Sequence, residues 1–125
     1  MSISLCHFDE IAFIPKEFDT GVAQFTKRKK PEIWFKHTDQ GMITGCACLL
    51  VVGHETARLS RLFVMPEKRS EGIATKLIKA RIEYARIKNF KQVDAKTYLD
   101  YTKYGFYIKQ QYKNEFYWWM KVLKK

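Results

Sequence analysis

The residues of this 125-residue chain that are best suited to chemistry form a glycine-bearing loop. An apolar run that includes Leu62, Phe63 and Val64 leads into the loop, and an amphipathic segment follows it. The loop and the start of that segment consist of Arg69, Ser70, Glu71, Gly72, Ile73, Ala74 and Thr75. A helix that begins there has backbone N–H groups without partners inside the helix, and its dipole is positive at that end. Because glycine has no Cβ, a ligand can approach the main chain closely at Gly72. The segment therefore predicts a cradle for a diphosphate group.

Two sequence blocks resemble the GCN5-related N-acetyltransferases. Arg69–Ala74 matches the family's Arg/Gln-x-x-Gly-x-Gly/Ala loop, which binds the pyrophosphate of acetyl-coenzyme A. Tyr101–Phe106 resembles the later Tyr-x-x-x-Gly-Phe motif at the expected distance downstream. The dinucleotide motif Gly-x-Gly-x-x-Gly and the triphosphate-binding Gly-Lys-Ser/Thr are absent from the sequence. The resemblance implies an acetyl-coenzyme A-dependent N-acetyltransferase that transfers the acetyl group directly to a primary amine in a ternary complex.

The same resemblance implies how the cosubstrate is held. In the family, the strand before the loop diverges from the next strand, and the pantetheine arm lies between the two. The backbone of Leu62, Phe63 and Val64 would bind the pantetheine amides, and the loop from Arg69 to Thr75 would surround the pyrophosphate. Lys103 occupies a place where related proteins often carry a basic residue that reaches the 3′-phosphate.

The resemblance also implies a proton donor for the departing thiolate. Tyr101 matches the family tyrosine whose hydroxyl lies near the coenzyme A sulfur and acts as a general acid. Tyr98 and Tyr104 lie within one helical turn of Tyr101 and remain alternatives for this role.

Several residues are candidates for the general base that deprotonates the amine. Glu55 and Asp94 are the acidic residues nearest to the expected cleft, and His37 and His54 are histidines able to titrate near neutral pH. Many members of the family deprotonate the amine through a chain of water molecules, so the role does not require any of the four.

Alternation and turn residues predict the elements that position this site. We expect strands over residues 3–8, 32–37, 42–52, 57–65, 92–97, 106–112 and 116–123. Residues 72–88 are expected to form a helix, because apolar side chains recur there at spacings of three and four at Ala74, Leu77, Ile78, Ile82 and Ala85. A brief helix is expected within 98–104, a hairpin turn at 38–41, and a helix or loop over 15–30.

This order of elements predicts an α/β fold that resembles the acyl-CoA N-acyltransferase fold of the family, with a mostly antiparallel mixed sheet and a central pyrophosphate-binding helix. With 46% hydrophobic residues, the chain is expected to form a single N-acetyltransferase domain over residues 1–125. No apolar run approaches the roughly 18 residues of a spanning helix, and no secretory signal is visible. We therefore expect a cytoplasmic protein without a membrane partner.

The three cysteines do not form a disulfide framework, because their number is odd. Cys46 and Cys48 lie two residues apart on an expected strand, so they share one face. We interpret them as small buried residues in a reducing compartment, and we expect no metal site.

The net charge of +10 exceeds what a coenzyme A site requires. Lys27, Arg28, Lys29 and Lys30 form a compact basic cluster outside both family blocks. Such a run is more often a solvated surface, and the other interpretation is a polyanionic partner, with nucleic acid foremost.

Two alternative functions stay open beside amine acetylation. One is a protein of the same fold that acts on nucleic acid or aminoacyl-tRNA, and the other is a catalytically silent acyl-coenzyme A-binding regulator or inhibitor. The acceptor is an unidentified small molecule or protein, and a homodimer is left open. We expect acceptor specificity to lie in the first thirty residues and in an aromatic-rich hairpin around Trp34, Tyr117, Trp118 and Trp119.

Overall fold

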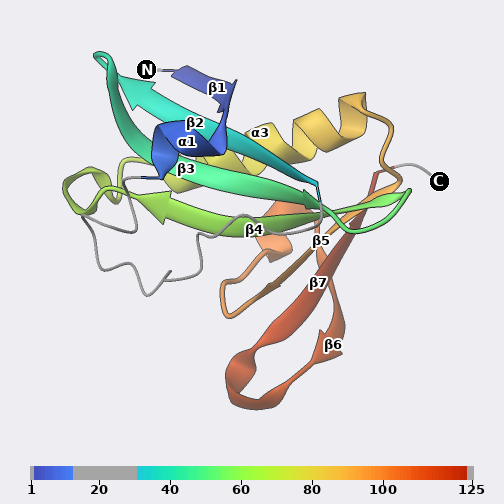
Figure 1. Ribbon diagram of the computed structural model, residues 1–125. Helices are drawn as coiled ribbons and strands as arrows, with labels where there is room; N and C mark the ends of the chain where they lie inside the picture. Colours follow the sequence, from blue (N-terminus) through green and yellow to red (C-terminus); the bar gives the residue numbers. More distant parts are fainter. Residues whose placement is uncertain (1, 13–30, 124–125) are drawn as a thin grey trace.

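The computed structural model describes residues 2–12 and 31–123, which form a seven-stranded sheet of order β1-β2-β3-β4-β5-β7-β6 (Figure 1). The strands are β1 (Ser2–Cys6), β2 (Glu32–Asp39), β3 (Met42–Val51), β4 (Thr56–Val64), β5 (Gln92–Thr97), β6 (Tyr107–Gln111) and β7 (Tyr117–Val122). The helices are α1 (Phe8–Ile11) and α3 (Ile73–Ile87), with 3-10 turns at η1 (Pro66–Lys68), η2 (Thr102–Tyr104) and η3 (Lys113–Glu115). Paired strands run antiparallel except β4 and β5, which are parallel. The expected mostly antiparallel α/β fold is confirmed.

Two apolar clusters cover opposite faces of the sheet, because successive strand residues point to opposite sides. Helix α3 lies behind the sheet in Figure 1 and buries Leu77 in one cluster with Phe35 of β2. Helix α1 lies on the other face and buries Ile11 with Cys46 and Cys48 of β3. The two thiols therefore share a buried face, as the sequence predicts, and burial raises the pKa of Cys46 to about 12.

Residues in left-handed conformations end two of these elements. Gln40 and Gly41 have φ values of 51° and 80° and make the tight turn between β2 and β3, which confirms the predicted hairpin. Asn89, with φ 68°, follows the end of α3, and asparagine tolerates this conformation better than most residues.

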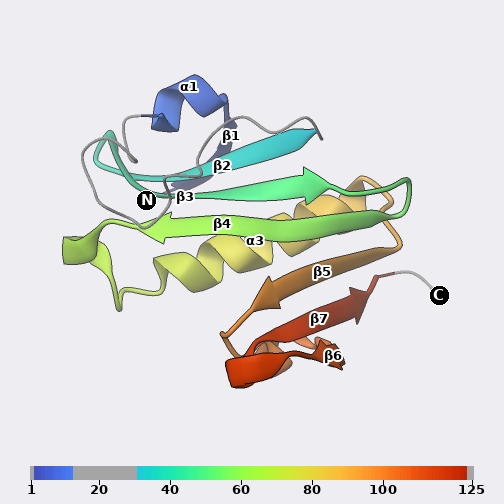
Figure 2. The same ribbon diagram turned by 60° about the horizontal axis from the view of Figure 1, so that its bottom comes forward.

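The parallel pair β4 and β5 is joined over only part of its length. Thr56, Ala57 and Arg58 pair with Gln92, Val93 and Asp94. Beyond that point β5 continues to pair with β7, while β4 continues to pair with β3. The two strands therefore diverge toward the end where α3 begins, as Figure 2 shows. This divergence opens the middle of the sheet.

The predicted strands agree with the observed ones to within two residues at each end. The short helix α1 was not predicted, and the segment 15–30 lies entirely outside the described residues. One expectation about the aromatic residues is wrong: Trp34 belongs to β2 and is buried against Phe8, whereas the β6–β7 hairpin extends away from the rest of the sheet (Figure 1). Within the described residues, no helix combines the length and apolarity needed to cross a bilayer.

Candidate functional site

The gap between the diverging strands is a cavity of about 290 Å³. One wall is β4 from Leu59 to Leu62, and the other is β5 from Ala95 to Thr97. Arg81 of α3 and Tyr101 also line it. Because β4 has no strand partner on this side beyond Arg58 among the described residues, its main-chain groups face the cavity and can bind a ligand. The cavity is thus a cleft along an edge of β4 that has no strand partner among the described residues.

Tyr101 is held in the cleft wall by aromatic neighbours. Its ring lies 5.5 Å from that of Tyr104, 5.4 Å from that of Phe106 and 6.4 Å from that of Trp119, measured between centroids. Burial raises the pKa of its phenol above the ordinary value, and the charge of Arg81 opposes part of that rise. The phenol is therefore protonated at neutral pH, as a proton donor must be.

The alternatives to Tyr101 lie in less suitable places. Tyr98 is 66% exposed and packs its ring against Phe116. The Tyr104 hydroxyl lies 3.2 Å from the Thr75 hydroxyl, at the first turn of α3. Neither of these two tyrosines lines the cleft, whereas Tyr101 does.

A β-bulge shapes β4 where it lines the cleft. Ala47 of β3 pairs with Leu62, and the next residue, Cys48, pairs with Ser60, so Arg61 is the extra residue. Arg61 has φ 47°, a left-handed conformation that costs about 1 kcal/mol or more for a residue with a Cβ. The bulge turns the β4 backbone within the cleft wall.

The glycine-bearing loop joins β4 to α3 at the open end of the cleft. It lines a second cavity of about 220 Å³ together with Val64 and the first turn of α3. Gly72 precedes that turn with φ 83°, and a Cβ built there would meet nothing within 4 Å. Among the described residues no side chain caps the helix, and its first turn holds no acidic residue. The free N–H groups and the helix dipole are available to an anion.

Arg69 is positioned by the end of β4. Its Nε donates to the Val64 carbonyl oxygen at 2.9 Å, and its guanidinium lies 5.7 Å from the centroid of the Phe63 ring. The rest of the guanidinium is exposed beside the loop, where it adds positive charge to the second cavity. Ser70 and Glu71 are also exposed, whereas Ile73 is buried under the loop.

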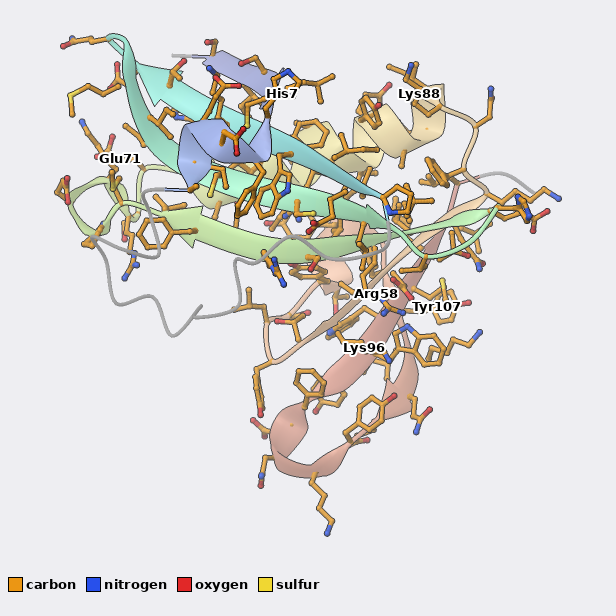
Figure 3. The ribbon with its side chains drawn as sticks, viewed as in Figure 1. His7, Arg58, Glu71, Lys88, Lys96 and Tyr107 are labelled. Carbon is orange, nitrogen blue, oxygen red and sulfur yellow. The ribbon has the colours of Figure 1, made fainter. Side chains whose placement is uncertain are left out.

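An ion pair closes the narrow end of the cleft. Asp94 of β5 is 1% exposed and accepts from Arg58 of β4 through both oxygens, at 2.9 and 3.0 Å. It also accepts from Trp118 Nε1 of β7 at 2.9 Å. Lys96 of β5, labelled in Figure 3, places its ammonium 5.2 Å from the centroid of the same Trp118 ring. Because Asp94 is fully engaged, it does not fit the role of general base.

The other three proposed bases lie away from the cleft. Glu55 is exposed at the closed end of β4 and pairs with Lys91 at 2.8 Å, so its expected place near the cleft is wrong. His54 is exposed in the turn before β4. His37 is buried, with Nδ1 2.6 Å from the Thr44 hydroxyl, and burial lowers its pKa. Neither histidine lines the two cavities described above.

Lys103 lies in a third, basic cavity of about 310 Å³ between α3 and β7. The charged residues that line this cavity are Lys79, Glu83, Arg86, Lys103 and Lys121. Glu83 pairs with Arg86, so three lysines remain to give the cavity its positive charge. Tyr104 also lines it, and Tyr104 contacts Thr75 at the start of α3. The third cavity therefore adjoins the loop.

Sequence reasoning missed three arginines of this region. Arg58 and Arg61 lie on β4, and Arg81 is buried in α3. A signal for Arg81 was present, because it lies four residues after Leu77 and four before Ala85, on the apolar stripe of the helix. No pattern marks Arg61 as a bulge. Within the described residues, no group of three or more His, Cys, Asp or Glu side chains is placed to hold a metal ion.

Comparisons with known proteins give a family and a fold. The model of the acetyltransferase (GNAT) family matches residues 3–119. Ard1 from Thermoplasma volcanium is similar in structure, with a TM-score of 0.77 and 19% identity, over 99% of this chain and 98% of that one. An acetyltransferase of the GNAT family from Elizabethkingia anophelis with acetyl-CoA bound has a TM-score of 0.65 and 22% identity, over 74% and 76%. An aminoglycoside 6′-N-acetyltransferase complexed with coenzyme A has a TM-score of 0.74 and 16% identity, over 100% and 98%. No curated protein sequence matches.

Proposed function

Because this chain belongs to the acetyltransferase (GNAT) family, we propose that it transfers the acetyl group of acetyl-coenzyme A to a primary amine in a ternary complex. Residues 1–125 would act as a single N-acetyltransferase domain. The observation that carries the proposal is the arrangement of the two cavities. The β4–β5 cleft, which contains Tyr101, leads along Leu62, Phe63 and Val64 to the uncapped start of α3.

This arrangement suits the two ends of the cosubstrate. The loop from Arg69 to Thr75 supplies free N–H groups, a helix dipole and one arginine for the diphosphate. The edge of β4 that lacks a strand partner supplies main-chain donors and acceptors for the amides of pantetheine, apart from the Ser60 carbonyl, which accepts from Arg81. The thioester would then lie between the bulge of β4 and Tyr101.

Tyr101 would complete the reaction. A neutral amine attacks the thioester carbonyl carbon, the C–N bond forms, and the C–S bond breaks. The departing thiolate takes the Tyr101 proton, and the proton lost by the amine returns to the phenolate through water. A buried and protonated phenol in the cleft wall favours this role. With Glu55 and Asp94 engaged elsewhere, we propose that water accepts the amine proton first.

The third cavity supports the prediction that Lys103 contacts the 3′-phosphate. Lys79 and Lys121 line the same cavity, and Tyr104 connects it to Thr75 of the diphosphate loop. We propose that the 3′-phosphate lies at its rim, where exposed ammonium groups contribute modestly to affinity.

The test measures acetyl-coenzyme A binding by calorimetry and thiol release in the presence of small amines, peptides and aminoacyl-tRNA. We expect binding without an acceptor, and thiol release with one class of amine. Binding without thiol release from any acceptor would instead favour the catalytically silent regulator. A chain that does not bind acetyl-coenzyme A would contradict both readings.

A further inference from the structure

Arg81 is a buried arginine whose hydrogen bonds reach both strands beside the β4 bulge. It lies in the middle of α3 and is 1% exposed. Its Nε donates to the Leu77 carbonyl oxygen of its own helix at 3.1 Å. Its Nη1 donates to the carbonyl oxygens of Cys48 at 2.9 Å and Ser60 at 3.2 Å. Arg81 therefore connects the central helix to β3 and β4 at once.

The two strand carbonyls lie at the position where the ladder is irregular. Cys48 pairs with Ser60, and the register shifts at the next pair because Arg61 is inserted. A bulge disrupts the local ladder, and buried carbonyl groups without donors cost free energy. The guanidinium supplies donors there, which explains how the left-handed Arg61 conformation persists in the cleft wall.

Among the described residues, Arg81 forms no ion pair with a carboxylate, and the nearby carboxylate of Glu32 pairs with Arg61 of the bulge at 3.8 Å. The ionisable side chains that interact with it are Tyr101, Cys48 and Cys46, a phenol and two thiols. Its Nη2 is buried without a hydrogen-bond partner in the described part of the chain. Burial lowers the pKa of Arg81, but a guanidinium stays protonated in proteins, so the group remains charged over the pH range in which Tyr101 titrates. Burying an arginine charge lowers the free energy of unfolding. A buried arginine at this position is therefore a candidate for a functional role.

We propose that Arg81 is a positioning residue, which holds the β4 bulge against α3 and places a fixed positive charge beside Tyr101 in the cleft. Both residues line the same cavity, and the other ionisable group that acts on Tyr101 is the neutral phenol of Tyr104. This inference depends on the proposed acetyl transfer only in taking Tyr101 as the general acid. In a poorly solvated site, a fixed positive charge favours the phenolate that forms when Tyr101 gives up its proton.

The experiment follows the Tyr101 phenol directly. Protein with ¹³Cζ-labelled tyrosine is titrated by NMR, and the Tyr101 signal is assigned from its loss in Tyr101→Phe. Four chains are compared: the parent, Arg81→Met, Arg81→Lys and Lys88→Met. Lys88 is the control because it lies exposed at the far end of the same helix, away from Glu71 and the loop (Figure 3). Circular dichroism establishes which variants are folded.

We expect Arg81→Met to move the Tyr101 titration to higher pH, because the charge that opposes the effect of burial is lost. In Arg81→Lys the buried amine should lose its charge below the pH at which Tyr101 titrates, because burial lowers a lysine pKa, so the Tyr101 titration should again move to higher pH. Lys88→Met should match the parent. An unmoved Tyr101 signal in folded Arg81→Met would overturn the electrostatic part of the proposal. If the methionine variant does not fold, Arg81→Gln takes its place with the same expected direction.

A second measurement tests the hold on the bulge. Arg81→Lys loses the planar guanidinium that binds the carbonyls of Leu77, Cys48 and Ser60 together, so amide hydrogen exchange at residues 60–62 should become at least several-fold faster. Unchanged exchange would overturn the positioning part. Neither measurement requires acetyl transfer, so failure here is distinct from failure of the proposed function. If transfer is observed, Arg81→Lys should lower kcat by about 10²-fold, the scale of a small misplacement in an active site.

Discussion

Gly72 combines a left-handed backbone conformation with open space where a side chain would lie. Its φ of 83° disfavours any residue with a Cβ, yet a Cβ there would meet no neighbour within 4 Å. Gly41 shares both properties, with φ 80°, in the turn between β2 and β3. Asp39, at the end of β2, pairs with Lys68, just before the loop, at 3.7 Å, but Gly41 does not line the second cavity. Alanine at either glycine therefore strains the backbone, but only alanine at Gly72 would also contact the proposed ligand.

The first prediction uses that pair. Gly72→Ala and Gly41→Ala should each lower the free energy of unfolding by about 1 kcal/mol, because alanine is strained at positive φ. Only Gly72→Ala should also weaken acetyl-coenzyme A binding, by about 1–2 kcal/mol, because the methyl group enters the space proposed for the diphosphate. Chemical denaturation and calorimetry measure the two effects. Equal affinities of the two variants for acetyl-coenzyme A would contradict the proposal that this loop binds the diphosphate.

The second prediction concerns Tyr101. Tyr101→Phe should lower kcat by about 10²–10⁴-fold and leave acetyl-coenzyme A affinity nearly unchanged, because only the proton donor is lost. Tyr98→Phe is the matched control and should retain the parent rate, since that ring is exposed outside the cleft. Single-turnover kinetics with a reactive amine provide the measurement. A Tyr101→Phe enzyme that works at full rate would transfer the role to solvent.

The third prediction concerns Lys103 and the 3′-phosphate. Lys103→Ala should weaken acetyl-coenzyme A binding roughly three- to fivefold, the scale of one exposed charge contact. The same variant should bind acetyl-3′-dephospho-coenzyme A as the parent does, because the partner of the lysine is then missing. Lys113→Ala, in the β6–β7 hairpin, is the control. An equal loss for both ligands would contradict this placement of the phosphate.

At the scale of elements, β4 and β5 are held together at one end and diverge at the other. Asp94 and Arg58 join them at the point where pairing stops, and Trp118 adds a bond from β7. Glu55 and Lys91 form a second ion pair near the opposite end of the joined segment, but both side chains are more than half exposed. Burial therefore distinguishes two ion pairs of similar chemistry, one between β4 and β5 and the other just before the two strands.

The fourth prediction compares these two carboxylates. Asp94→Asn should lower the free energy of unfolding by about 2–3 kcal/mol, because Arg58 loses a buried partner and is left as an uncompensated charge. Glu55→Gln should change it by less than about 0.5 kcal/mol, as exposed pairs contribute little. Urea denaturation measures both. A similar small effect for the two variants would show that the pair at the base of the cleft is not structural.

At the scale of the whole molecule, the net charge of +10 is much larger than the proposed cosubstrate requires. The described cations of the loop and the third cavity account for part of it. The cluster Lys27, Arg28, Lys29 and Lys30 lies outside the described residues, and its role stays a prediction from the sequence.

The fifth prediction tests that cluster. We expect it to be a solvated surface, so the parent protein should show no salt-dependent binding to RNA or DNA at physiological ionic strength. If nucleic acid were a partner, each phosphate contact would contribute about 0.7–0.9 to the slope of log K against log salt. Filter binding at three salt concentrations, with the parent and a variant in which all four residues are replaced by glutamine, measures this. A steep slope that disappears in the variant would favour the nucleic-acid alternative.

The sequence alone determined most of the elements and predicted the loop that we propose binds the diphosphate. Strands, turns and the helix depend on patterns within a few residues, such as Gln40-Gly41 in the hairpin or the apolar stripe of α3, and these patterns act locally. The same holds for the motif from Arg69 to Ala74, because a phosphate cradle is built from one loop and the helix that follows it.

Only the tertiary structure decided which side chains meet in the cleft. Arg58 and Asp94 are 36 residues apart, and Arg81 and Cys48 are 33 apart, so no local pattern brings them together. Glu55 and Asp94 looked equivalent in the sequence, yet one is exposed at the closed end and the other is buried under an arginine. Strand divergence, the bulge at Arg61 and the burial of Arg81 depend on how three strands and a helix share one space. Packing between distant segments, rather than the preference of any single segment, determines these features.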